Sequence, residues 1–85
     1  MATINSLRKK LNAVDAKILV LLEKRVALVS QVRECKGEQG ISFINRARER
    51  ELIHTAQKNS SLSEESVEKL LRTVLQISKK ELKNL

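Results

Sequence analysis

Two basic residues occupy positions that the rest of their segment fills with apolar side chains. Arg25 lies between Leu21 and Leu28 in a series of apolar residues spaced by three and four, the spacing of one buried helix face. Lys36 follows about three helical turns later on nearly the same face. One arginine could lie along apolar surface and release its charge at an edge. Two inward cations favour a site for an anionic ligand.

A second apolar series, near the end of the chain, is interrupted by Ser78 and Glu81. Each has an ordinary explanation, because a serine in a helix can bond to its own backbone and a glutamate near a chain end can be solvated. Cys35 is the single cysteine and His54 the single histidine, so neither a disulfide within the chain nor a metal site is expected. The predicted chemistry is anion binding without metal or cofactor.

The elements that position these residues are predicted to be helices. The chain has no proline, two glycines and one aromatic residue, and so has few residues typical of strands. A long N-terminal helix is predicted over residues 7–36, with Asn5 or Ser6 as its cap and Gly37 as its stop. The predicted fold class is all-α.

Two further helices follow a connector over residues 38–42. A short one is predicted over residues 46–58 with Asn45 as its cap, and a medium one runs from Ser63 to the C-terminus. Acidic residues after Ser63 suit the positive end of a helix dipole. The 85 residues are expected to form a single domain.

The first helix is too long for a compact single chain. Its roughly 30 residues extend about 45 Å, whereas a globule of this size is only about 30 Å across. Short chains also bury little surface and usually gain from a disulfide, a metal or a partner. The overhanging apolar face therefore predicts a homodimer.

The net charge of +7 attracts anions of many kinds. Nucleic acid is not the expected partner, because only one aromatic residue is available for stacking and the basic residues are spread along the chain. No apolar run approaches the length of a membrane span, and the start lacks the apolar region of a signal peptide. A cytoplasmic protein without a membrane partner is expected.

The runs LRKKLNAVD at residues 7–15, ILVLLEKR at 18–25 and VRECK at 32–36, with the triplet Arg48-Glu49-Arg50, resemble the all-helical (type II) chorismate mutases. The resemblance covers nearly the whole chain. It implies an intertwined dimer of three-helix chains, which agrees with the second copy predicted from helix length. It also implies the rearrangement of chorismate to prephenate, without a cofactor, in the shikimate-pathway branch toward phenylalanine and tyrosine.

This one-step pericyclic reaction breaks a C–O bond as a C–C bond forms, and negative charge grows on the ether oxygen. The enzyme must hold the enolpyruvyl arm over the ring and offer donors to that oxygen. By the resemblance, Arg8 and Arg25 grip carboxylates through their planar forks. Lys36 reaches both the ether oxygen and a carboxylate, and Ser78 adds a bond to a carboxylate.

The resemblance also implies a group of residues at the ring hydroxyl of the substrate. Arg48 and Glu49 lie there, with Glu49 accepting the hydroxyl proton. The backbone at Asn45 approaches the same hydroxyl, although the family often has aspartate at this position.

The chain departs from the family at Leu82, where a glutamine or glutamate normally supplies a second donor to the ether oxygen. Glu81 lies one residue earlier, about 100° around the helix, and serves only if the helix rotates or the register slips. Its carboxyl donates only when protonated, so such a site favours acidic pH. Lys79 occupies a position that the family usually keeps apolar beside the substrate.

The interpretation is a chorismate mutase with Arg25, Lys36 and Glu81 as catalytic residues. Because Arg8 and Lys36 are about 42 Å apart along one helix, Arg8 is expected to reach the site of a partner chain. One alternative is an isochorismate-pyruvate lyase with a similar set of cations. The other is a weakly active or inactive helical dimerisation or regulatory module of a fused shikimate-pathway enzyme.

Overall fold

The computed structural model describes residues 3–39 and 46–83. These residues form three helices: α1 over Ile4–Gln39, α2 over Arg46–Asn59 and α3 over Glu64–Lys83. Their lengths are 36, 14 and 20 residues, and the described residues contain no strand. The predicted all-α class, with one long, one short and one medium helix, is confirmed.

Helix α1 is longer at both ends than predicted. Thr3 is its cap, because the Thr3 hydroxyl accepts a hydrogen bond from the Ser6 amide at 3.1 Å. The prediction of Asn5 or Ser6 as the cap was therefore wrong. The prediction of Gly37 as the stop was also wrong, because α1 continues to Gln39. Replacing alanine by glycine lowers the stability of a helix by only about 1 kcal/mol. The neighbouring glutamate and glutamine favour the helix and can offset this loss.

The predicted start of α3 is confirmed. The Ser63 hydroxyl accepts from the Ser66 amide at 3.2 Å, and the Ser63 carbonyl accepts from the Val67 amide at 3.1 Å. Helix α2 ends at Asn59, one residue later than predicted. Its predicted cap, Asn45, lies outside the described residues, as does the C-terminal Leu85.

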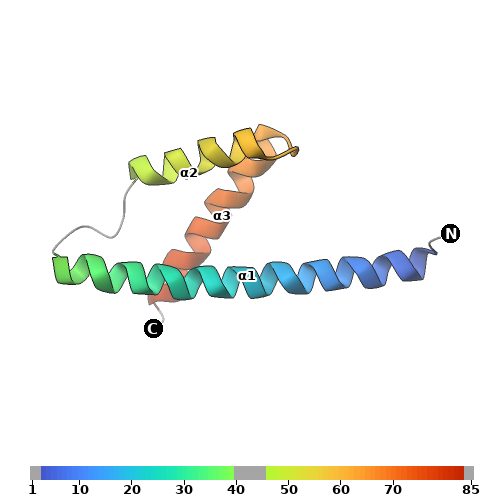
Figure 1. Cartoon of the computed structure of the whole chain (residues 1–85), viewed down its shortest axis with the longest axis horizontal. Helices are drawn as coiled ribbons and strands as arrows, with labels where there is room; N and C mark the ends of the chain where they lie inside the picture. Colours follow the sequence, from blue (N-terminus) through green and yellow to red (C-terminus); the bar gives the residue numbers. More distant parts are fainter. Residues whose placement is uncertain (1–2, 40–45, 84–85) are drawn as a thin grey trace.

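Helix α3 joins the other two helices (Figure 1). It contacts both α1 and α2, whereas within residues 3–39 and 46–83 the backbones of α1 and α2 do not approach within 8 Å of each other. Among the residues whose burial the structure describes, few are buried, namely Ile53, Val67, Ser78 and Leu82. The small core therefore follows α3.

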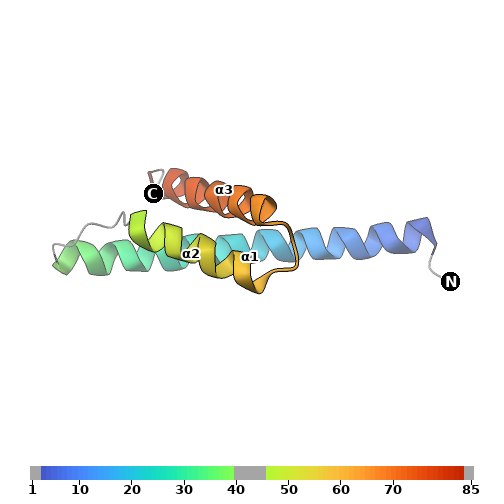
Figure 2. The same cartoon turned by 90° about the horizontal axis from the view of Figure 1, so that it is seen from above.

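The N-terminal part of α1 projects beyond the other helices in both views (Figures 1 and 2). The molecule measures 57 × 29 × 16 Å, and its radius of gyration is 16.2 Å, against about 12 Å for a compact chain of this length. Large apolar side chains on α1 are exposed, including Leu7, Leu11, Val14, Ile18, Leu21, Leu28 and Val32. The predicted overhang is confirmed. None of the described helices has the length and apolar character needed to cross a membrane.

Candidate active site

Arg25, the arginine on the apolar face of α1, contacts α3. The Arg25 guanidinium donates a hydrogen bond to the Ser78 hydroxyl at 2.8 Å, and the two residues come from helices far apart in sequence. Arg25 is half-buried and Ser78 is 3% exposed. The prediction that Arg25 faces inward is confirmed, and its contact is a polar group of α3 rather than the edge of an apolar surface.

Ser78 makes two hydrogen bonds. Its hydroxyl donates to the Val74 carbonyl at 3.1 Å and accepts from Arg25. Ser78 therefore bonds to the backbone of its own helix, as a serine in a helix commonly does, and also contacts Arg25. A guanidinium has five N–H donors, and Ser78 takes one, so Arg25 can also bind an anion bidentately.

A second polar contact lies at the next residue of α3. The Lys79 ammonium donates to the Glu49 carboxylate at 2.8 Å to one oxygen and 3.4 Å to the other. Glu49 is in the first turn of α2, beside the exposed Arg48. Consecutive residues of α3 thus connect it to α1 through Ser78 and to α2 through Lys79.

Leu82 lies one turn beyond Ser78 and is 3% exposed, so an apolar side chain is buried there. The Arg33 guanidinium donates to the Leu82 carbonyl at 3.1 Å. A cation at this place offsets the negative end of the α3 dipole. Sequence reasoning did not single out Arg33, and no local pattern relates it to a residue so distant in the chain.

Glu81 is placed apart from these contacts. Its side chain is exposed and lines a hollow of about 230 Å³ with Glu23 and the apolar residues Leu19, Leu22, Val26 and Ile77. Neither Arg25 nor Ser78 lines this hollow. The structure therefore does not bring Glu81 to the hydrogen bond between α1 and α3.

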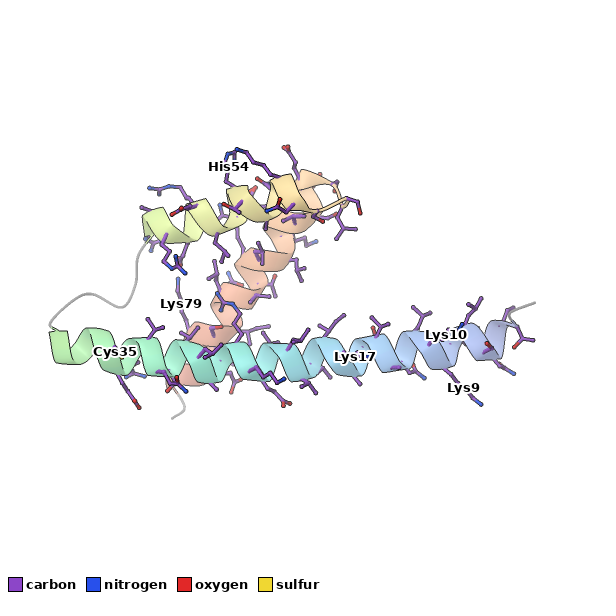
Figure 3. All side chains as sticks on the ribbon, viewed as in Figure 1. Lys9, Lys10, Lys17, Cys35, His54 and Lys79 are labelled. Carbon is purple, nitrogen blue, oxygen red and sulfur yellow. The ribbon has the colours of Figure 1, made fainter. Side chains whose placement is uncertain are left out.

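Two of the remaining predicted site residues, Arg8 and Lys36, are not brought together within one chain. Arg8 is exposed and directly precedes Lys9 and Lys10, which Figure 3 labels on the projecting part of α1. Lys36 lies in the last turns of the same continuous helix, about 42 Å from Arg8 along the axis. Asn45 lies outside the described residues.

The chain is similar to a known protein family and to a solved structure along most of its length. The sequence profile described as chorismate mutase type II matches residues 7–83. A similar solved structure is that of chorismate mutase (form I) from Thermus thermophilus. The two chains are 30% identical with a TM-score of 0.80, over 88% of this chain and 96% of the Thermus chain. No protein of curated function matches.

Proposed function

This chain belongs to the type II chorismate mutase family and is an isomerase that converts chorismate to prephenate, and we propose that its active site is shared between two copies of the chain. The observation that most directly supports an active site between α1 and α3 is the hydrogen bond of 2.8 Å between Arg25 and Ser78. It places a cation and a hydroxyl together where α1 and α3 cross. Both suit a carboxylate of the substrate.

The carboxylate end of the proposed site is formed by cations and a hydroxyl. Arg25 and Ser78 bind one substrate carboxylate in this proposal, and the bidentate fork of Arg25 fixes its orientation. Lys36 donates to the ether oxygen and to a carboxylate. Because negative charge grows on the ether oxygen as the C–O bond breaks, a donor aimed at it stabilises the transition state more than the substrate.

The hydroxyl end of the proposed site is formed by the first turn of α2 and the residue before it. Glu49 accepts the proton of the ring hydroxyl, Arg48 lies beside it, and the backbone at Asn45 adds a further contact. These groups hold the ring while the cations hold the arm. Catalysis then consists of positioning and electrostatic stabilisation, without a nucleophile, a metal or a cofactor.

The second donor to the ether oxygen is the weakest part of this site. Leu82 has no donor at the position where the family normally has one. Glu81, which lines the separate hollow, would supply this donor only after a rotation of about 100° around the helix axis, and that rotation would also move Ser78 away from Arg25. A low turnover number is expected if this rotation does not occur.

Two features of α1 support a second copy, and the second of them assumes the substrate contact proposed for Arg8. The exposed apolar stripe of α1 has no cover within the chain's described residues. Arg8 and Lys36 also cannot contact one ligand from one chain, because chorismate is only about 10 Å long and the helix separates them by about 42 Å. A two-fold dimer covers the stripe and brings the partner's Arg8 to each site.

The dimer is testable by sedimentation equilibrium with two variants. The native chain of 9.7 kDa is expected at about twice that mass, with a melting temperature that rises with concentration. Leu11→Lys places a charge in the exposed apolar stripe and is expected to weaken dimerisation roughly tenfold or more, since a buried leucine contributes about 1.5–3 kcal/mol. The neighbouring Asn12→Lys adds the same charge outside the stripe and is the control. A stable, folded monomer of the native chain at micromolar concentration would contradict the dimer.

The reaction is tested by product identification. Purified protein is expected to accelerate the loss of chorismate absorbance over the uncatalysed rate, with prephenate as the product. Pyruvate released from isochorismate would instead indicate the lyase, and no acceleration would indicate a dimerisation or regulatory module. We place the reaction in the cytoplasm, in the shikimate-pathway branch toward phenylalanine and tyrosine.

A further inference from the structure

We propose that Lys79 is a positioning residue of the active site, which holds the Glu49 carboxylate in the orientation that accepts the ring hydroxyl of the substrate. The inference rests on the proposed role of Glu49. It assigns a role to a charged residue at a position that the family usually keeps apolar.

The contact between the two residues is close and partly shielded from water. The Lys79 ammonium lies 2.8 Å and 3.4 Å from the two Glu49 oxygens, so it engages the whole carboxylate. The side chains are 36% and 20% exposed, respectively. Figure 3 shows Lys79 projecting from α3 toward the first turns of α2. A partly buried pair is screened less by salt than a surface pair.

The position of Glu49 depends on α3. Within the described residues, the backbone of α2 approaches α3 but not α1. The orientation of Glu49 relative to Arg25 is therefore set through α3, where Ser78 contacts Arg25 and the next residue, Lys79, contacts Glu49. A free glutamate side chain has several rotamers, and the ammonium selects the one that faces α3.

The charge of Lys79 also suits its place. Chorismate has two carboxylates, which a bare Glu49 carboxylate would repel. An ammonium on Glu49 offsets this repulsion and leaves carboxylate lone pairs available for a hydroxyl proton. The ring hydroxyl takes no part in bond breaking, so its contact with Glu49 is about equal in the substrate and the transition state. An interaction of that kind lowers KM and leaves kcat nearly unchanged.

The experiment compares KM and kcat of four variants of the dimeric enzyme. Lys79→Met keeps the length and removes the charge, and is expected to raise KM about tenfold with little change in kcat. Lys79→Gln is expected to have the same effect and replaces Lys79→Met if that variant does not fold. Lys79→Arg is expected to restore KM to near the native value. The exposed neighbour is the control, so Lys80→Met is expected to be unchanged.

A double variant separates positioning from direct contact with the substrate. Glu49→Ala is expected to raise KM, and Lys79→Met in that background is expected to add nothing, because its partner is already gone. A further rise would mean that Lys79 binds the substrate itself and would overturn the inference. An unchanged KM in Lys79→Met, together with a raised KM in Glu49→Ala, would also overturn the inference about Lys79, while the role of Glu49 would stand. An unchanged KM in Glu49→Ala would overturn that role and this inference together.

Discussion

Arg8→Ala and Lys36→Ala are each expected to lose nearly all chorismate mutase activity, yet a co-refolded mixture of the two should recover about a quarter of the native activity. The reason is the continuous helix α1, which keeps these two residues about 42 Å apart in one chain. Each site of the proposed dimer takes Arg8 from one chain and Lys36 from the other. A mixed dimer collects both substitutions in one site and leaves the second site intact.

The recovered fraction follows from random exchange. Half of the dimers are mixed, and each mixed dimer has one good site of two, which gives the quarter. Lys9→Ala, an exposed neighbour of Arg8, is the control and should be active alone. Mass spectrometry of the native dimer would verify the mixing. If the verified mixture stays inactive, the shared site is wrong, and Arg8 is better interpreted as a solvated residue near the start of α1.

Leu82→Gln is expected to raise kcat by about tenfold to a hundredfold. A single donor aimed at a developing oxyanion can lower the barrier by about 3–4 kcal/mol. Part of this gain is lost, because Leu82 is 3% exposed and a glutamine there buries an amide. Steady-state kinetics at saturating chorismate would measure the gain, and thermal unfolding would confirm that the variant is folded.

Two further variants identify the donor. Leu82→Met retains an apolar side chain of similar volume and should not raise kcat. If Glu81 supplies the second donor, Glu81→Ala should lower kcat sharply and Leu82→Gln should restore it. An unchanged or lower kcat in folded Leu82→Gln would mean that this position is not at the ether oxygen or that another group already donates there.

The helices and the inward direction of Arg25 could be predicted from the sequence because both depend on periodicity. A helix face repeats along the chain, and a charge placed on it is visible from spacing alone. The ends of α1 were less predictable. Which residue caps α1, Thr3 or Asn5, depends on a free-energy difference of about 1 kcal/mol. Whether the helix continues through Gly37 depends on a difference of similar size, and other contacts can outweigh both.

The contacts between helices could not be predicted from spacing. The pairs Lys79 with Glu49 and Arg33 with the Leu82 carbonyl join residues that are distant in sequence. Their distances depend on the angle and depth at which α3 packs against its neighbours, which no local pattern specifies. Lys79 was noticeable in sequence only as a cation at an unexpected position.

The exposed stripe on α1 has a consequence for how much product a cell obtains from a given amount of the enzyme. If only the dimer is active, then at concentrations well below its dissociation constant the number of working sites grows with the square of chain abundance, by mass action. A twofold change in expression would then change flux about fourfold. Above that constant the response becomes proportional, so the affinity of the two helix faces sets the expression level above which prephenate supply grows only in proportion to the amount of chain.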